Sequence, residues 1–381
     1  MSKTKAPRII LAGGGTGGHV FPAVAVAQAL KRASPQAEVL FVGTERGLES
    51  RVLPQMGYAL KTLTVRHLKG SGALGWARGL GTLPLSAMQA LGIVWGFGPD
   101  VVVSVGGYAA GPVTMLAALM GKPTVLLEQN AYPGMTNRLL SKVVRRCYLS
   151  LPDRSATLPA DKCQLVGNPL RQEILDRAGM HVEDEGRDRG KEFRILITGG
   201  SGGAGPLNKG LPRALRQMDD AIATKLVVCH QAGRNRAQPV WDDYRGFAGE
   251  VEVVEFIDDM AKAYGWADLV ICRSGATTLA ELLVLGQPSM LIPFAGAADN
   301  HQEANALSVV QSGAAVMVRE EELNAGRLER LLEGLVRNPS SLDRMGQRAA
   351  QLGKPEAADV VAQGLLELAG VRASAKQGAG A

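Results

Sequence analysis

The chain has 381 residues, of which 46% are hydrophobic and 20% charged, so its composition excludes a disordered or fibrous protein. At about 150 residues per domain, the length predicts two domains. The total charge of +6 hides an asymmetry, because residues 1–170 hold 18 Lys and Arg against 7 Asp and Glu, a net charge of +11 that leaves −5 for the remainder.

The basic first half predicts an anionic partner. Each Lys or Arg near an anionic membrane contributes roughly 1 kcal/mol to binding. Nucleic acid would also require stacking aromatic residues, and aromatic residues make up only 4% of the chain. We therefore expect an anionic membrane surface, and no nucleic acid, as a partner.

The cysteines and the N-terminus predict a reducing, cytoplasmic location. The apolar run of residues 9–12 is too short for the core of a signal peptide. The four cysteines form no C-x-x-C pair and have no histidine at metal-binding spacing. Free thiols are expected in such a compartment.

The first predicted element is a strand at residues 8–12, followed by a glycine loop at residues 13–18 and a helix at 23–33. A glycine loop between a strand and a helix exposes backbone N–H groups that bind phosphate. His19 follows this loop, at a helix start where the dipole favours the neutral imidazole of a general base. A histidine that only caps or packs the helix is the alternative.

The second predicted strand, residues 39–42, weakens a dinucleotide-binding interpretation. Such sites have an acid about 20 residues after the glycines, at the end of the second strand, that binds a ribose. Here Glu38 precedes the strand, and Gly43 and Thr44 end it. Glu45 keeps an NAD-dependent oxidoreductase open as an alternative.

Residues 79–99 contain no charged side chain. An uncharged segment of this length could just span a bilayer. Five glycines and a proline interrupt this segment and disfavour a long spanning helix. We expect instead a helix that lies in the membrane interface, with a core-facing helix as the alternative. The predicted membrane patch consists of Trp76, Leu80, Leu83 and Trp95.

Three features of the first half recur in the same order in the second, which indicates a duplicated architecture. The first is a strand that leads into G-x-G-x-x-G, at residues 8–18 and 194–205. The second is an apolar strand that ends in glycine, at 99–107 and 267–275, and the third is a G-x-P turn before a strand, at 121–127 and 286–292. Helical stretches alternate with these strands, a pattern typical of parallel α/β sheets. We predict two Rossmann-like domains that face a cleft, at residues 1–167 and 168–355. A C-terminal helix and tail at 356–381 is predicted to pack back on the first domain.

Two further strand ends carry polar residues. Glu128, Gln129 and Asn130 end one strand, and the segment 273–281 forms a second strand-to-helix anion site with Glu281 one turn into its helix. An acid that only pairs with the helix dipole is the alternative for Glu281. Neither loop contains a D-x-D pair, so a Mg²⁺-bridged diphosphate is not indicated.

Six short motifs, in collinear order between residues 8 and 318, closely resemble the MurG family of glycosyltransferases. They lie at residues 14–22, 106–108, 128–130, 166–171, 272–276 and 299–302. The resemblance implies a GT-B fold of two Rossmann-like domains and a role in bacterial peptidoglycan synthesis. It also implies the inverting transfer of N-acetylglucosamine from UDP-N-acetylglucosamine to the C4 hydroxyl of undecaprenyl-diphospho-N-acetylmuramoyl-pentapeptide.

The same resemblance implies roles for individual residues, with no metal and no cofactor beyond the UDP-sugar substrate. His19 would be the base, and Tyr108 and Glu128 would border the pocket for the lipid acceptor. The protein would sit peripherally on the cytoplasmic face of the inner membrane. The implied donor-binding residues are Thr16, Gly17, Gly18, Asn130, Arg171, Ser201, Ile257, Ala276, Thr277, Thr278, Leu279, Ala280, Glu281 and Gln302.

The sequence departs from the family pattern at two positions. Gly202 stands where the family usually has Gln, which affects a side-chain contact to the donor, and Leu127 stands where His is common, which affects a supporting hydrogen bond. Another UDP-sugar enzyme of the same fold, such as a glycolipid glycosyltransferase or a UDP-sugar 2-epimerase, is the nearest alternative. A non-catalytic, membrane-bound nucleotide sensor is a third.

Overall fold

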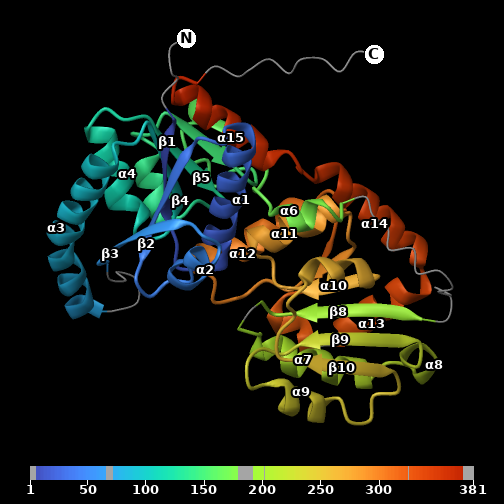
Figure 1. Cartoon of the computed structure of the whole chain (residues 1–381). Coiled ribbons are helices and arrows are strands. Elements are labelled where there is room, and N and C mark those ends of the chain that lie inside the picture. The colour runs from blue at the N-terminus through green and yellow to red at the C-terminus, as the bar shows by residue number, and fades with distance from the viewer. Residues whose placement is uncertain (1–5, 66–71, 179–191, 201, 325, 372–381) are drawn as a thin grey trace, which may run out of the picture. The chain divides into compact units, whose positions relative to one another are not determined.

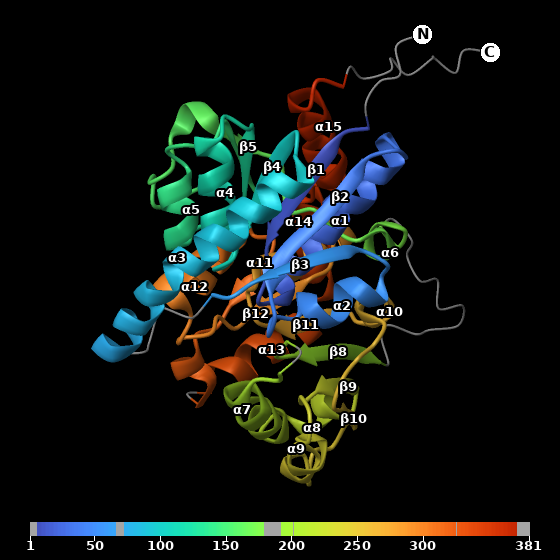
Figure 2. The ribbon, with the colours of Figure 1, turned by 60° about the vertical axis from the view of Figure 1, so that its left-hand side comes forward.

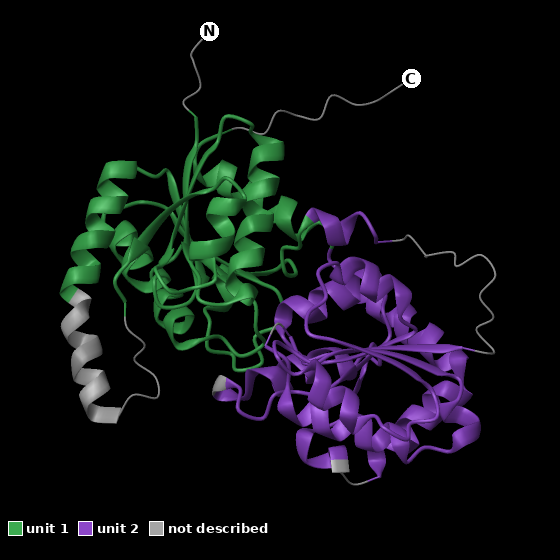
Figure 3. Cartoon of the chain, turned by 60° about the horizontal axis from the view of Figure 1, so that its bottom comes forward, with its two compact units in different colours: residues 1–171, 355–381 green, residues 172–354 purple. Residues whose placement is uncertain are grey.

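The computed structural model describes residues 6–65, 72–178, 192–200, 202–324 and 326–371. The described chain divides into two compact units (Figure 3). Unit 1 comprises residues 1–171 and 355–381, and unit 2 comprises residues 172–354. Residues 372–381 of the predicted C-terminal tail lie outside the described residues.

Unit 1 is built on a seven-stranded parallel sheet with the strand order β3-β2-β1-β4-β5-β6-β7. The order runs one way from β1 to β3 and the other way from β4 to β7, so the direction of winding reverses between β1 and β4. The strands are β1 (Arg8–Gly13), β2 (Glu38–Thr44), β3 (Ala59–Leu63), β4 (Val101–Gly106), β5 (Thr124–Glu128), β6 (Arg146–Leu149) and β7 (Cys163–Leu165).

Both faces of this sheet are buried because successive strand residues point to opposite sides. Ile9 and Leu11 of β1 pack in one cluster with α1 and α15. Ile10 and Ala12 pack in a second cluster with α3 and α4. The helices of unit 1 are α1 (Gly17–Ala33), α2 (Glu49–Gln55), α3 (Gly72–Phe97), α4 (Ala110–Leu119), α5 (Met135–Leu140) and α15 (Ala357–Leu368), with a 3-10 turn η1 at Ala160–Lys162.

The last helix, α15, packs beside α1 although more than 300 residues separate them (Figure 1). Val361, Ala362 and Leu365 of α15 are fully or almost fully buried in the cluster around β1. Arg32 at the end of α1 donates a hydrogen bond to Asp359, at 2.8 Å. The last described helix therefore packs on the unit that contains the first strand.

Unit 2 repeats the topology of the first sheet in six parallel strands, in the order β10-β9-β8-β11-β12-β13. Its winding reverses between β8 and β11, the counterparts of β1 and β4. This confirms the predicted fold class of two Rossmann-like parallel-sheet domains. The strands are β8 (Phe193–Thr198), β9 (Leu226–Gln231), β10 (Glu250–Val254), β11 (Leu269–Cys272), β12 (Ser289–Leu291) and β13 (Val316–Met317).

The helices of unit 2 surround this sheet and bury a core that includes Ile195, Ile197, Leu211 and Leu332. They are α6 (Gln172–Leu175), α7 (Gly205–Arg216), α8 (Asp220–Ala223), α9 (Ala237–Asp243), α10 (Met260–Trp266), α11 (Ala276–Leu285), α12 (His301–Val310), α13 (Arg327–Arg337) and α14 (Pro339–Leu352), with 3-10 turns η2 (Ala298–Asn300) and η3 (Glu320–Asn324).

Helix α3 occupies the uncharged segment and packs against α4 (Figure 2). Ser86, Ala90 and Val94 are fully buried on one face of the helix. The opposite face is also apolar, and Trp95 is 77% exposed and Met88 71% exposed. The core-facing alternative therefore describes one face of α3 and leaves a second, exposed apolar face. The side chains of Trp76, Leu80 and Leu83 lie outside the described residues.

Among the described residues, no helix combines the length and apolar character needed to cross a bilayer. The four cysteines are free; Cys147 and Cys272 are buried, and Cys163 and Cys229 are half-buried.

A buried histidine in unit 2 links stability to pH. His230 on β9 is fully buried between Tyr244, whose hydroxyl lies 2.9 Å from Nδ1, and Asn208, whose Oδ1 lies 3.2 Å from Nε2. Asn208 donates its amide to the carbonyl of Ala232, so its oxygen faces His230 and accepts from Nε2–H. Burial lowers the pKa of His230 to about 3, whereas an unfolded histidine titrates near 6.5.

We predict that this histidine destabilises the fold as the pH falls below about 6.5, because only the unfolded chain then takes up the proton. The expected contribution is about 1.4 kcal/mol per pH unit. Urea unfolding of wild type and His230→Gln at pH 7 and pH 5 measures it. Wild type should lose about 2 kcal/mol more than the variant over this interval, and equal losses would refute the assignment.

Candidate active site

The loops after β1 and β4 meet at the carboxyl edge of the unit 1 sheet, where the direction of winding reverses. Open α/β sheets bind ligands at this position. Gly106 ends β4 and Gly107 follows it, with φ angles of +92° and +87°. A Cβ on Gly107 would lie 2.7 Å from the carbonyl oxygen of Gly14. Only glycine at position 107 allows the two loops to approach this closely.

His19 lies in this junction, half-buried in the first turn of α1. Its Nδ1 is 3.2 Å from the carbonyl oxygen of Gly14 and 3.5 Å from Oγ1 of Thr16. Because a carbonyl only accepts hydrogen bonds, this contact places the proton on Nδ1 and the lone pair on Nε2. A Cβ on Gly106 would lie 2.8 Å from Nε2, so the ring packs directly on that glycine.

The first turn of α1 presents the predicted anion-binding residues. Thr16 is the N-cap and is exposed, Gly17 begins the helix and Gly18 is exposed. No acidic residue of α1 occupies its first turn, so no carboxylate of the helix itself opposes the partial positive charge at its N-terminus. The guanidinium of Arg171 lies 4.6 Å from the ring centroid of Phe21, which places this cation beside the same turn.

Glu128 has a structural role that the sequence did not indicate. It is 3% exposed, and its carboxylate accepts the N–H groups of Asn130 and Gly134 and the side-chain amide of Asn137, at 2.8–3.1 Å. Burial raises the pKa of Glu128, and these donors oppose the rise. The carboxylate thus ties down the loop after β5. Its predicted contact with the acceptor stays a prediction, as does that of half-buried Tyr108, which follows Gly107.

In unit 2, the predicted diphosphate site is the N-terminus of α11. Gly275 is the N-cap and makes no side-chain capping bond, and Ala276, Thr277, Thr278, Leu279 and Ala280 form the first turns of the helix. The N–H groups of a first turn have no partner within the helix. They are therefore well suited to an anion.

Gln302 stands in a hydrogen-bonded link between two strand-end loops of unit 2. Its Oε1 accepts from the N–H of Phe294 at 3.0 Å, and its backbone carbonyl accepts from the hydroxyl of Ser274 at 2.7 Å. Just before it, Asp299 and Asn300 adopt left-handed φ angles of 53° and 52°. Such conformations are uncommon outside glycine and cluster at functional sites.

Glu281 is 8% exposed, and its Oε2 accepts a hydrogen bond from the hydroxyl of Tyr264 at 3.0 Å. The carboxylate is therefore held in a fixed orientation one turn into α11. Ile257 donates its N–H to Oε1 of Gln231 at 3.2 Å, and the amide of Gln231 donates to the carbonyl of Gly200 at 2.9 Å. The N–H of Ile257 thus already has a partner within the protein. Ser201 lies outside the described residues.

Glu49, the first residue of α2, was not predicted from the sequence. Its side chain is buried at 1% exposure and binds the glycine loop after β1. The sequence feature that accompanies this buried side chain is a set of three glycines, because a Cβ on Gly14, Gly43 or Gly47 would overlap the Glu49 carboxylate. The sequence shows these glycines but does not show what they surround.

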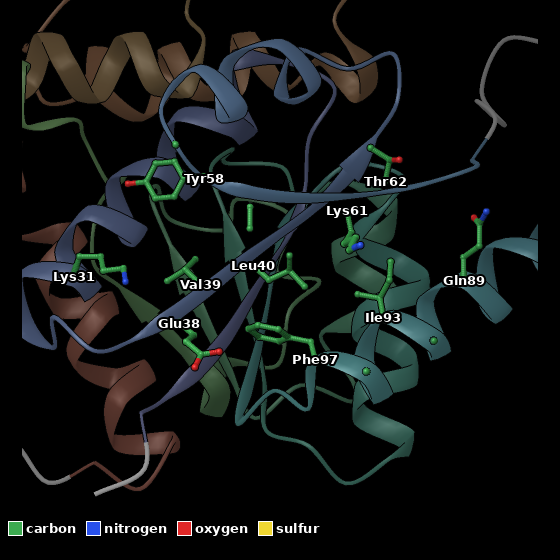
Figure 4. A pocket seen from close by; sticks show the side chains of 14 residues that line it. Lys31, Glu38, Val39, Leu40, Tyr58, Lys61, Thr62, Gln89, Ile93 and Phe97 are labelled. Atoms are coloured by element: carbon green, nitrogen blue, oxygen red, sulfur yellow. The ribbon is translucent and has the colours of Figure 1, made fainter. Parts of the chain in front are cut away.

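A cavity of about 920 Å³ lies elsewhere in unit 1, between α3 and the strands β2 and β3 (Figure 4). Leu40, Lys61, Ile93 and Phe97 are among its lining residues, which include none of the predicted site residues. Because ligands of open parallel sheets bind at the carboxyl strand ends, we place the candidate active site at the strand-end loops and not in this cavity.

The chain is similar to known glycosyltransferases along most of its length. Residues 9–149 match the glycosyltransferase family 28 N-terminal domain, and residues 194–361 match the glycosyltransferase family 28 C-terminal domain. A UDP-N-acetylglucosamine–N-acetylmuramyl-(pentapeptide) pyrophosphoryl-undecaprenol N-acetylglucosamine transferase of Myxococcus xanthus is 45% identical over 362 residues, 95% of this chain and 93% of the relative. The transferase of the same name from Geobacter sulfurreducens is 41% identical, over 93% of this chain and 96% of the relative.

Solved structures give the same result. The crystal structure of Acinetobacter baumannii MurG matches with a TM-score of 0.78 and 30% identity, over 95% of this chain and 99% of that one. A UDP-N-acetylglucosamine 2-epimerase of Neisseria meningitidis has a TM-score of 0.66 at 15% identity, which shows a shared fold only. The comparisons do not favour the epimerase or oxidoreductase alternatives. The chain therefore belongs to the MurG family of UDP-N-acetylglucosamine–N-acetylmuramyl-(pentapeptide) pyrophosphoryl-undecaprenol N-acetylglucosamine transferases.

Proposed function

We propose that this protein transfers N-acetylglucosamine from UDP-N-acetylglucosamine to the C4 hydroxyl of undecaprenyl-diphospho-N-acetylmuramoyl-pentapeptide. Family membership over 95% of the chain supports the donor and the acceptor. The observation that carries the chemistry is the position of His19. It lies where the winding of the sheet reverses, with its Nδ1 against the Gly14 carbonyl.

The proposed reaction is a single displacement. His19 takes the C4 hydroxyl proton on Nε2 as the hydroxyl oxygen attacks C1 of the donor sugar. The bond between C1 and the diphosphate oxygen breaks on the opposite side, and UDP leaves as an anion. One displacement inverts the configuration at C1.

The departing UDP requires positive charge. In unit 2, the N-terminus of α11 would provide N–H groups and a helix dipole for the diphosphate. The cation implied by the family resemblance is Arg171, which lies beside the first turn of α1. The strand-end loops contain no D-x-D pair, so we assign this charge to the protein and require no metal or other cofactor. Glu281 would hold the ribose hydroxyls in the orientation set by Tyr264.

The exposed face of α3 supports a peripheral position on the membrane, on the cytoplasmic side. Leu85, Met88, Leu91 and Trp95 are each between 42% and 77% exposed and share this face. Residues 1–170, which include it, carry the net charge of +11. Apolar insertion and attraction to anionic headgroups act together in such surfaces.

The first prediction concerns the reaction. Wild-type protein, UDP-N-acetylglucosamine and the lipid-linked muramoyl-pentapeptide should yield a disaccharide lipid, detected by mass spectrometry. His19→Ala should lower kcat by about 10²- to 10⁴-fold, the usual contribution of a general base, and should leave donor affinity unchanged. A wild-type protein without product would refute the function, and full turnover by His19→Ala would refute the base.

The second prediction concerns the donor. Glu281→Gln should raise the KM for UDP-N-acetylglucosamine about tenfold, because a hydrogen bond to a charged group contributes about 1.5–3 kcal/mol. Tyr264→Phe, which removes only the partner of the same carboxylate, should have a smaller effect. An unchanged KM in Glu281→Gln would show that the carboxylate does not bind the donor.

The third prediction concerns the membrane. Trp95→Ser should lower co-sedimentation with vesicles that contain anionic lipid by about tenfold, because burial of one large apolar side chain contributes about 1.5–3 kcal/mol. Trp241→Ser is the matched control, since Trp241 is 46% exposed but lies in unit 2. Equal binding by both variants would contradict the role of α3.

A further inference from the structure

One peptide group connects a buried carboxylate to the candidate base. The N–H of Gly15 donates to Oε2 of Glu49 at 2.7 Å. The carbonyl of Gly14, which belongs to the same peptide group, lies 3.2 Å from Nδ1 of His19. The peptide thus donates to a carboxylate at one end and accepts from an imidazole at the other.

The Glu49 carboxylate is held firmly in this position. Its second oxygen, Oε1, accepts the backbone N–H of Thr44 at 2.8 Å and the Thr44 hydroxyl at 2.9 Å. The side chain is 1% exposed. It fills space that is available because Gly14, Gly43 and Gly47 have no Cβ atom. Each carboxylate oxygen therefore has a hydrogen-bond donor, and the side chain has little room to move.

Among the hydrogen bonds of the described residues, none joins Glu49 directly to His19, and the Gly14–Gly15 peptide is the hydrogen-bonded link between them. A hydrogen bond to a charged acceptor is stronger than a neutral one. Hydrogen bonds in a chain polarise one another, so donation to Glu49 makes the Gly14 carbonyl a better acceptor. A better acceptor at Nδ1 favours the tautomer with the proton on Nδ1 and the lone pair on Nε2.

We propose that Glu49 is a positioning residue that acts on His19 through the Gly14–Gly15 peptide. It fixes the tautomer of the ring and holds Nε2 toward the reacting hydroxyl, as a carboxylate in direct contact with a histidine does in hydrolase triads. The catalytic consequence rests on the proposed function of His19 as the base. The series of hydrogen bonds from Glu49 to His19 does not depend on that function.

The tautomer is tested directly by ¹H–¹⁵N NMR of the full chain with labelled histidine. The chain has five histidines, and the spectrum of His19→Gln identifies the signals of His19. Wild-type His19 should be the Nδ1–H tautomer, and a dominant Nε2–H form would overturn the proposal. This measurement needs no variant of Glu49.

Glu49→Gln then tests the carboxylate. The amide has nearly the shape of the carboxylate but lacks its charge, and its NH2 group cannot accept the hydrogen bond that one carboxylate oxygen accepts, so the Nδ1–H form of His19 should lose population. The kcat should fall by about tenfold, which is part of the contribution of a general base, while the KM for UDP-N-acetylglucosamine should stay within about twofold. Glu45→Gln is the matched control, because Glu45 is exposed on the loop between β2 and α2, just before Glu49, and it should match wild type.

A purely structural role for Glu49 predicts a different result. A loosened loop would raise the KM and lower the thermal stability while the tautomer of His19 stayed the same, and this pattern would overturn the proposal. If His19→Ala proved fully active, the base would be wrong, but the tautomer shift in Glu49→Gln would still show the chain of hydrogen bonds. If the tautomer did not shift while His19→Ala was inactive, only the inference about Glu49 would fail.

Discussion

The close approach of two glycine loops at the carboxyl edge of the unit 1 sheet is the constraint on which the candidate site depends. Parallel strands must end at the same edge, and the reversal of winding between β1 and β4 leaves their loops side by side. Gly107 removes the side chain that would strike the Gly14 carbonyl, and Gly106 removes the one that would strike the His19 ring. The geometry of His19 follows from these two missing side chains.

The duplicated topology gives the chain two strand-end sites, one for each of the two proposed substrates. Both sheets reverse their winding between the first and fourth strands of their unit, so each unit has a strand-end site next to a helix N-terminus. The units differ in charge: residues 1–170 carry +11 and the rest −5. The proposed binding of an anionic UDP-sugar by the acidic unit would therefore rely on local N–H groups, such as those at the start of α11, and not on net charge.

Much of this arrangement was predictable from the sequence because it rests on local signals. The alternation of strand-like runs with helical stretches predicted the parallel sheets, and the predicted C-terminal helix and tail at 356–381 contains α15 (Ala357–Leu368). The glycine loops and their repeat predicted two Rossmann-like domains. The helical stretch predicted at 23–33 lies within α1, which begins at Gly17, and His19 lies in the first turn of this helix.

The missed features are those that depend on contacts between distant segments. Glu49 binds a loop 34 residues away in the sequence, and no spacing rule predicts a carboxylate that acts through a peptide. Burial of Glu128 and donation of the Ile257 N–H to Gln231 likewise appear only when strands and loops are brought together. The apolar segment at 79–99 fitted both a core helix and an interfacial helix, and α3 has one face suited to each.

The configuration of the new glycosidic bond tests the central claim most directly. A single displacement with His19 as the base inverts C1, so an α-linked UDP-sugar must give a β-linked disaccharide, which the coupling constant of the anomeric proton shows by NMR. We expect the β-linked product alone. An α-linked product would require two displacements or a front-face reaction, and would contradict a single displacement with His19 as the base.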